Sequence, residues 1–364
     1  MKHRLIPTAA MSAALVLALA ACSDQGTTDT GATGGAADGG SSLSGSVKAS
    51  GSSAQKNAMA EWINAFQTKN PGVTIDYQAN GSGAGIQDFI NNQTAFAGSD
   101  AALKPEEKTK ADARCTGGQA INIPMVGGAI ALAYNVEGVD SLVLTPEVIA
   151  GIFNSSITKW NDPKIAELNS GVTLPDAAIA QFHRSDESGT TQNFTSYLAA
   201  TASDVWTYEV AKAWTAPGGQ GAKGSDGVAS ALTSTPNSIG YVELSFVLDG
   251  DLKAAQVDNG GGAVEATSAN AATTIEQATV VGQGNDLALK LDPTIAKAGA
   301  YPIVLVTYEI TCSKGLPADQ LAVVKPFLQY TASAEGQGLL EGIGYVPVTG
   351  ELLTKVQASV EALS

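Results

Sequence analysis

The sequence predicts a mixed α/β protein built of two domains. Apolar residues make up 44% of the chain and charged residues 15%, a balance typical of a globular protein with a sizeable core. Beyond residue 45 the chain continues for about 320 residues, more than a single core usually supports. Apolar runs typical of strands alternate with segments of helical spacing, which favours α/β layering.

The N-terminal residues 1–21 have the organisation of a secretory signal peptide. Lys2 and Arg4 precede an apolar run from Met11 to Leu19, which is too short to span a membrane permanently. Cys22 follows in a sequence that resembles the lipobox of bacterial lipoproteins, so we expect export and acylation of Cys22. A soluble protein that is cut nearby and keeps a free Cys22 is the alternative.

The next segment, residues 22–45, consists almost wholly of Ser, Thr, Gly, Ala and Asp, and predicts a flexible tether behind the lipidated cysteine. The chain has a formal net charge of −15, and removing residues 1–21 leaves 35 acidic and 18 basic residues, or −17. This acidity argues against nucleic-acid binding and against direct adhesion to an anionic membrane. An anionic ligand would have to be held by local dipoles and hydrogen bonds.

The two remaining cysteines are Cys115 and Cys312. An oxidising compartment favours a disulfide between them, and two buried free thiols are the alternative. We expect no metal site, because His183 is the one histidine after the signal peptide and the cysteines lack zinc-type spacing.

The predicted elements can be followed along the chain. A strand from Ser46 ends in a Gly/Ser turn at residues 51–53, and a buried helical stripe follows at Met59, Trp62, Ile63 and Phe66. We then expect strands at residues 73–78, 120–124, 129–135 and 177–182, and helices near 83–91, 146–153 and 192–198. The Gly-, Ala-, Asn- and Thr-rich residues 258–274 predict a surface excursion.

Three of the predicted helices begin with a Ser/Gly-rich turn that follows a strand, at residues 51–54, 80–85 and 185–190. Unpaired N–H groups and the positive end of the dipole make such a helix start favourable for an anion. Arg184 offers a planar fork for phosphate or carboxylate oxygens, and Asp186 is close enough to hold that fork. For the third turn alone, a capped helix with a surface ion pair is the simpler interpretation.

Catalytic and nucleotide-binding motifs are incomplete. The sequence has no GxxxxGK[ST] loop, and residues 81–86 lack the third glycine of the dinucleotide fingerprint. An S-x-x-K pattern starts at Ser53 and again at Ser156, without its usual K-T-G and S-D-N partners. His183 and Ser188 could be a base and a nucleophile, but no G-x-S-x-G elbow is present. We therefore expect neither an enzyme nor a cofactor.

Residues 45–364 resemble the phosphate-binding proteins of bacterial ABC phosphate uptake systems. The ordered set that carries the resemblance is Tyr77-Gln78, Gly81-Ser82-Gly83, Gly98-Ser99-Asp100, residues 157–163, residues 184–190, residues 224–227 and residues 238–243. The resemblance implies that inorganic phosphate is bound by Ser53, Ala54, Ser82, Asp100, Arg184, Ser188, Gly189 and Thr190. It also implies that Asp186 orients Arg184.

Two positions depart from the pattern of this family. Ser53-Ala54 stands where members commonly have Thr-Phe, which leaves a hydroxyl and a main-chain N–H for binding but weakens the expectation of cleft closure on that side. Glu187 stands where a small residue is usual, and adds a negative charge beside the site. We expect binding to survive both changes.

The resemblance implies a type II periplasmic-binding-protein-like fold, in which two α/β lobes, each a sheet flanked by helices, close by hinge motion. Lobe I would comprise residues 46–122 with 303–364, and lobe II residues 123–302. The two crossovers of the hinge would fall near residues 122–124 and 301–302. Both cysteines would then belong to lobe I.

The implied function is high-affinity capture of inorganic phosphate and its delivery to a membrane-embedded ABC phosphate permease. We expect an exported monomer, held to the outer face of the cytoplasmic membrane only through its lipid. A receptor for sulfate or molybdate, a secreted phosphate-ester hydrolase and a surface adhesin or signalling lipoprotein are the alternatives. Asp100 discriminates between the anions, because it can accept a hydrogen bond only from a protonated ligand.

Overall fold

The computed structural model describes residues 43–364. The predicted signal peptide at residues 1–21, the lipidation site Cys22 and most of the tether at residues 22–45 lie outside the described residues. The first strand begins at Ser44 rather than at Ser46. Within the described part, every helix is too short or too polar to cross a membrane.

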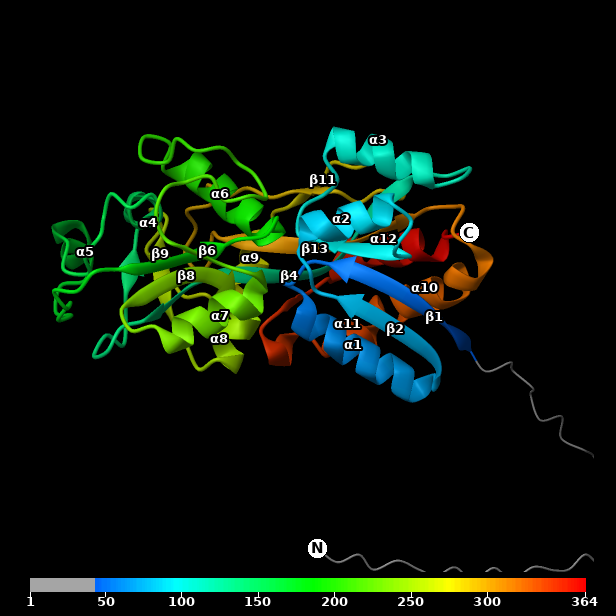
Figure 1. Cartoon of the computed structure of the whole chain (residues 1–364), viewed down its shortest axis with the longest axis horizontal. Coiled ribbons are helices and arrows are strands. Elements are labelled where there is room, and N and C mark those ends of the chain that lie inside the picture. The colour runs from blue at the N-terminus through cyan, green and yellow to red at the C-terminus, as the bar shows by residue number, and fades with distance from the viewer. Residues whose placement is uncertain (1–42) are drawn as a thin grey trace, which may run out of the picture. The chain divides into compact units, whose positions relative to one another are not determined.

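Strands and helices alternate along the described chain, which confirms the predicted α/β class (Figure 1). The strands are β1 (Ser44–Gly51), β2 (Gly72–Gln78), β3 (Phe96–Ser99), β4 (Ala120–Asn135), β5 (Val143–Leu144), β6 (Ala180–Arg184), β7 (Gln220–Ala222), β8 (Ser238–Glu243), β9 (Lys253–Asp258), β10 (Ala263–Val264), β11 (Thr279–Val280), β12 (Leu289–Lys290), β13 (Val304–Cys312) and β14 (Val346–Pro347). The helices are α1 (Lys56–Lys69), α2 (Ser82–Ile90), α3 (Pro105–Arg114), α4 (Pro146–Phe153), α5 (Pro163–Leu168), α6 (Gly189–Thr201), α7 (Gly224–Ser234), α8 (Leu244–Asp249), α9 (Ser268–Ile275), α10 (Ala318–Thr331), α11 (Ala334–Gly338), the 3-10 turn η1 (Glu341–Ile343) and α12 (Gly350–Glu361).

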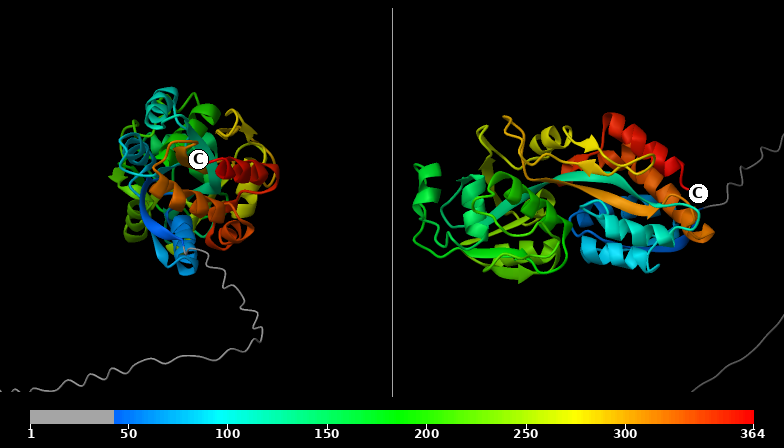
Figure 2. Two further views of the ribbon diagram at one scale, coloured as in Figure 1. Left: turned by 90° about the vertical axis from the view of Figure 1, so that its right-hand side faces the viewer. Right: turned by 90° about the horizontal axis from the view of Figure 1, so that it is seen from above.

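The principal sheet runs in the order β2-β1-β3-β13-β4-β8-β6-β7. Its outer parts are parallel, because β1 pairs in parallel with β2 and β3, and β6 pairs in parallel with β7 and β8. The antiparallel strands β13 and β4 connect these two parts. Figure 2 shows them from above as two long neighbouring strands through the middle of the fold.

The buried apolar side chains form two clusters. The terminal core draws on both ends of the described chain and includes Trp62, Phe96 and Phe327. The middle core is built mainly from the segment between them, includes Trp160 and Tyr241, and also takes in Ala54 and Val346.

Two long strands pass from one core to the other. Along β4 the buried side chains pass from the terminal core to the middle core between Val126 and Ala129. Along β13 the corresponding boundary between the two cores falls between Leu305 and Val306. Both positions lie a few residues beyond the predicted lobe boundaries, which follow residues 122 and 302. The boundaries between two lobes that move as rigid bodies stay a prediction.

Local patterns explain much of this architecture. In α1 the predicted stripe is buried at Met59, Trp62 and Phe66, while Ile63 is half-buried against the same core. The two predicted strands at residues 120–124 and 129–135 are one strand, β4, so their separation was wrong. Gly127 interrupts the apolar pattern, yet it is paired on both sides, with Val306 of β13 and Val346 of β14.

The prediction of a surface excursion at residues 258–274 was also wrong. The segment contains β10 and most of α9, in which Ala271 and Thr274 are buried. The Thr274 hydroxyl donates to the carbonyl of Tyr301 at 2.7 Å. A helix of small residues packs closely without the large apolar stripe that usually identifies a buried helix.

A disulfide joins Cys115, at the C-terminal end of α3, to Cys312, at the end of β13. Their Cα atoms are 5.3 Å apart, and the sequence separation is 197 residues. The predicted pairing is confirmed. Both cysteines belong to the terminal core. The bond therefore links the N-terminal and C-terminal segments that build this one core.

Candidate functional site

The three Ser/Gly-rich turns lie together although they are far apart in the sequence. The carbonyl of Gly51, at the end of β1, accepts a hydrogen bond from the N–H of Gly81 at 2.8 Å. The hydroxyl of Ser82, at the start of α2, accepts a hydrogen bond from the N–H of Gly189, at the start of α6, at 3.2 Å. The starts of α2 and α6 therefore meet directly, next to the turn that precedes α1.

Asp100 follows β3 and is buried at the centre of this arrangement, with 3% of its surface exposed. Its Oδ1 accepts hydrogen bonds from the hydroxyls of Ser52 and Thr307, the latter at 2.8 Å. Its Oδ2 accepts one from the Ser82 hydroxyl at 3.1 Å. Burial raises the pKa of Asp100, while these hydroxyls and the charge of Arg184 act in the opposite direction.

Arg184, the last residue of β6, is 2% exposed and forms a two-point ion pair with Asp186. Its Nε donates to Oδ1 at 2.8 Å and its Nη2 to Oδ2 at 2.6 Å, while Nη1 donates to the Ser225 hydroxyl at 3.3 Å. Burial acts to raise the pKa of Asp186, but its bonds to Arg184 outweigh burial and lower it. Asp186 also accepts the N–H of Gly224 at 3.0 Å, so the guanidinium is held in one orientation.

The third turn supplies a capped helix start. The Ser188 hydroxyl accepts the N–H of Thr191 at 3.2 Å, so Ser188 is the N-cap of α6. The Thr190 hydroxyl is 2.5 Å from Oε1 of Glu243, at the end of β8. Ser188, Gly189 and Thr190 are all buried.

The first turn connects to α7. The Ser53 hydroxyl accepts the N–H of Ser225 at 3.0 Å and lies 3.0 Å from the Ser225 hydroxyl. The N–H of Ala54 donates to the Ser52 hydroxyl at 3.0 Å, and the Ala54 carbonyl accepts the Tyr345 hydroxyl at 2.7 Å. All eight residues predicted to bind the ligand are therefore buried in one connected region; whether each contacts a ligand stays a prediction.

Several polar residues of this region were not among the predicted ligand-binding residues. Ser225 and Glu243 lie in segments that carry the family resemblance, so the sequence contained a weak signal for both. Ser52 is the immediate neighbour of a predicted residue. Thr307 had no signal, because it lies in an apolar strand and reaches Asp100 only through the pairing of β13 with β3. Asn193, whose side chain donates to the Asp100 carbonyl at 2.7 Å, is likewise placed by tertiary structure.

The site lies where segments of the terminal core meet segments of the middle core. The N–H of Gly83 donates to the carbonyl of Glu187 at 3.0 Å, while the Glu187 side chain is exposed. Lys212, 6% exposed at its side chain, donates to Glu107 at 2.6 Å. With the Ser82–Gly189 contact, these bonds hold the two sides together across the site.

His183 has no contact that would make it a general base for Ser188. Its ring stacks on Trp214, with centroids 4.9 Å apart and an interplanar angle of 10°. Its Nδ1 lies 3.0 Å from the carbonyl of Arg184, and burial lowers its pKa. The Ser188 hydroxyl meanwhile caps α6, so neither side chain has the geometry of a catalytic pair.

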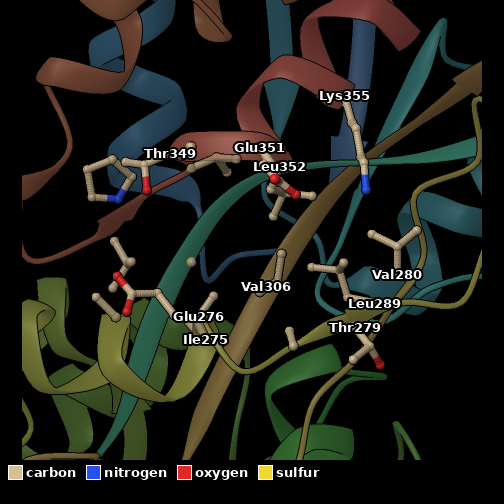
Figure 3. Close-up of a pocket in the computed structure, with 17 residues that line it drawn as sticks. Ile275, Glu276, Thr279, Val280, Leu289, Val306, Thr349, Glu351, Leu352 and Lys355 are labelled. Atoms are coloured by element: carbon tan, nitrogen blue, oxygen red, sulfur yellow. The ribbon is translucent and has the colours of Figure 1, made fainter.

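A cavity of about 580 Å³ lies elsewhere, beside the strands that pass between the cores. Its walls include Gly127, Val306 and Val346, with Lys355 of α12 and Glu276 after α9 at its edge (Figure 3). None of the predicted ligand-binding residues lines it.

Comparison with known proteins identifies the family. A sequence model described as a PBP superfamily domain matches residues 36–335. Phosphate-binding protein PstS 3 of Mycobacterium tuberculosis is 45% identical over 323 residues, covering 88% of this chain and 87% of that protein. Phosphate-binding protein PstS 2 of the same species is 42% identical, covering 87% and 86%.

Solved structures agree at the level of the fold. A high-affinity periplasmic phosphate-binding protein bound with phosphate superposes with a TM-score of 0.70 at 22% identity, covering 86% of this chain and 93% of that one. The predicted α/β class and the type II periplasmic-binding-protein fold are thereby confirmed. On its sequence and its fold, the chain belongs to the PstS family of phosphate-binding proteins, within the PBP superfamily.

Proposed function

We propose that this protein binds inorganic phosphate at the meeting point of the three turns and delivers it to an ABC phosphate permease. The observation that carries the proposal is the position of one guanidinium and one carboxylate among converging helix starts. Arg184 and the N–H groups of α2 and α6 favour an anion. Asp100 narrows the choice to an anion that carries a proton.

The selection by Asp100 follows from hydrogen-bond chemistry. A carboxylate inside an anion site repels a ligand that has only acceptor oxygens. Phosphate near neutral pH keeps at least one hydroxyl, which can donate to Asp100, whereas sulfate and molybdate cannot do so when fully deprotonated. A site built to accept a ligand hydrogen bond rejects an analogue without it by about 10⁴-fold or more. Phosphate is therefore the ligand that this donor and acceptor set fits best.

Isothermal titration calorimetry with phosphate, sulfate and molybdate at fixed ionic strength tests the proposal. The purified protein should first be unfolded and refolded to remove any ligand carried through purification. We expect saturable phosphate binding at one site and sulfate binding weaker by several orders of magnitude. Equal affinity for sulfate would favour the general oxyanion receptor, and the absence of phosphate binding would refute the proposal.

We further propose that the terminal and middle cores belong to two lobes that close on the ligand. Support comes from the passage of β4 and β13 between the cores and from the bonds across the site, such as Gly83 to Glu187. Hinge closure around a ligand needs only a few residues to absorb the change in backbone angle. Small-angle X-ray scattering should show a smaller radius of gyration with phosphate than without it.

The proposed setting is the outer face of the cytoplasmic membrane. Lys2, Arg4 and the apolar run that follows support export, and the sequence at Cys22 supports acylation. The strongly acidic chain supports attachment through lipid rather than through the protein surface. We propose that the protein acts as a monomer. We also propose that its function is binding, because the His183 and Ser188 geometry gives no support to hydrolysis of phosphate esters. A chromogenic phosphate ester should therefore be left intact.

A further inference from the structure

Glu243 is a second carboxyl group beside the proposed phosphate site. It is 1% exposed, and its Oε1 lies 2.5 Å from the hydroxyl of Thr190, one of the predicted phosphate-binding residues. Its Oε2 is buried and has no hydrogen-bond partner among the described residues. A buried carboxylate with a free oxygen is costly, so its protonation state needs a physical account.

The hydroxyl of Thr190 carries a single proton. If Glu243 is ionised, it can only accept, and Thr190 must give it that proton. Thr190 would then present lone pairs to a bound phosphate oxygen, which is itself an acceptor. If Glu243 is a neutral acid with its proton on Oε1, it donates that proton to the Thr190 oxygen, and the Thr190 proton is then free for the phosphate.

The charges around Glu243 favour the neutral acid. Arg184 on β6 is the cation that faces it, while Asp100 after β3 and Tyr345 before β14 are the other titratable groups near it. Arg184 is already paired with Asp186. An ionised Glu243 would make a third carboxylate around one guanidinium, with phosphate as a further negative charge. Burial raises the pKa of Glu243, and Asp100 acts in the same direction, while Arg184 and the hydroxyls of Ser225 and Thr190 act against them.

We propose that Glu243 is held as a neutral carboxylic acid and acts as a positioning residue that turns the Thr190 hydroxyl proton toward the ligand. The proposal rests on the proposed phosphate function and deepens it. Phosphate would be recognised by an acceptor at Asp100 and by a donor at Thr190 whose direction is set by Glu243. Two buried carboxyl groups in one site would thus have opposite protonation states and opposite roles.

Infrared spectroscopy of the phosphate-free protein at pH 7 tests the protonation state without relying on binding. Glu243→Gln should remove a carboxylic-acid C=O band that the wild-type protein shows. Glu309→Gln is the matched control, because Glu309 is another fully buried glutamate, and it should leave the Glu243 band in place. Thr190→Val is a second variant, needed if Glu243→Gln does not fold. It removes the hydrogen-bond partner of Glu243 and should therefore shift the frequency of the Glu243 carboxylic-acid band. A spectrum that neither Glu243→Gln nor Thr190→Val changes in this region would overturn the proposal.

Calorimetry with inorganic phosphate tests the positioning role. Glu243→Gln keeps a donor toward Thr190, so its dissociation constant at pH 6 should stay within about threefold of wild type, whereas Glu243→Ala should lose at least tenfold. In a Thr190→Val background both changes should have little further effect. A loss above tenfold in Glu243→Gln would overturn the proposal. So would a ratio of the wild-type dissociation constant to the Glu243→Gln dissociation constant that falls as the pH is lowered from 7 to 6, because it would show that Glu243 is ionised at pH 7. Absence of binding by the wild-type protein would instead refute the proposed function, and the infrared result would still decide the state of Glu243.

Discussion

Thr307 donates a hydrogen bond to Asp100 at 2.8 Å, across a sequence separation of 207 residues. Together with Ser52 and Ser82 it surrounds the Asp100 carboxylate with hydroxyl donors. Such donors favour the ionised form of Asp100. Only this form accepts a hydrogen bond from a proton-bearing ligand with either of its oxygens. The selectivity of the site should therefore depend on the charge of Asp100.

Asp100→Asn should narrow the ratio of phosphate affinity to sulfate affinity by at least tenfold, because the amide supplies a donor as well as an acceptor. Competition binding with both anions at fixed ionic strength measures the ratio. Thr307→Val is a useful companion, since it removes one donor to Asp100 and leaves the carboxylate in place. If Asp100→Asn has the same ratio of phosphate affinity to sulfate affinity as wild type, other residues must discriminate between the two anions.

Arg184→Ala should weaken phosphate binding by about 2 to 4 kcal/mol, or about 30-fold to nearly a thousand-fold. The change removes the guanidinium and leaves Asp186 as an unpaired negative charge beside the anion. Arg184→Lys should recover only part of the affinity, because an ammonium lacks the planar fork. Lys56→Ala is the matched control: Lys56 pairs with Asp226 near the site but is exposed, so its loss should cost less than about threefold. An unchanged dissociation constant in Arg184→Ala would move the binding site elsewhere.

Replacing Cys115 and Cys312 with serine should lower the free energy of unfolding by up to about 5 kcal/mol, because a bond across 197 residues restricts the unfolded chain strongly. Phosphate affinity should stay nearly unchanged, since neither cysteine contacts the site. Denaturant titration and calorimetry measure the two effects. In the oxidised protein, with Cys22 deleted or blocked, thiol titration under denaturing conditions should find no free thiol before reduction and two afterwards.

Glu309 should make the wild-type protein less stable as the pH rises. It lies on β13 with no exposed surface, and burial raises its pKa to about 8. The folded state thus binds a proton that the unfolded state releases near the ordinary glutamate pKa of about 4.5. The stabilisation is complete below that value and is lost as the pH rises through about 8.

The glutamine side chain in Glu309→Gln cannot ionise. Comparing this variant with wild type therefore isolates the contribution of Glu309 to the pH dependence of the unfolding free energy. Relative to the variant, wild type should lose at most about 5 kcal/mol of unfolding free energy between pH 5 and pH 9. Denaturant unfolding at several pH values measures the difference. Parallel curves for the two proteins would show that Glu309 does not titrate in this range.

Cys22→Ala should release the protein into the medium or leave it unprocessed, because durable anchoring requires covalently attached lipid chains. Cell fractionation followed by mass spectrometry of the N-terminus distinguishes the two outcomes. A variant that stays with the membrane fraction like wild type would argue against the lipobox.

The sequence determined the chemistry that is local in the chain. Helix starts rich in Ser and Gly after strands predicted the three turns, because capping and unpaired N–H groups depend on neighbouring residues. The stripe in α1 and the closeness of Arg184 to Asp186 are local in the same sense. Asp100 was assigned through the family resemblance, since a single aspartate after a short strand has no pattern of its own.

Tertiary structure decided which distant groups meet. Thr307 reaches Asp100 because β13 lies beside β3, and Glu243 reaches Thr190 because the end of β8 lies against the start of α6. Sheet order depends on how strands separated by more than a hundred residues bury their apolar faces, which no short window of sequence contains. The continuity of β4 through Gly127 and the burial of α9 were missed for the same reason: pairing and close packing supplied by remote strands compensate for a weak local pattern.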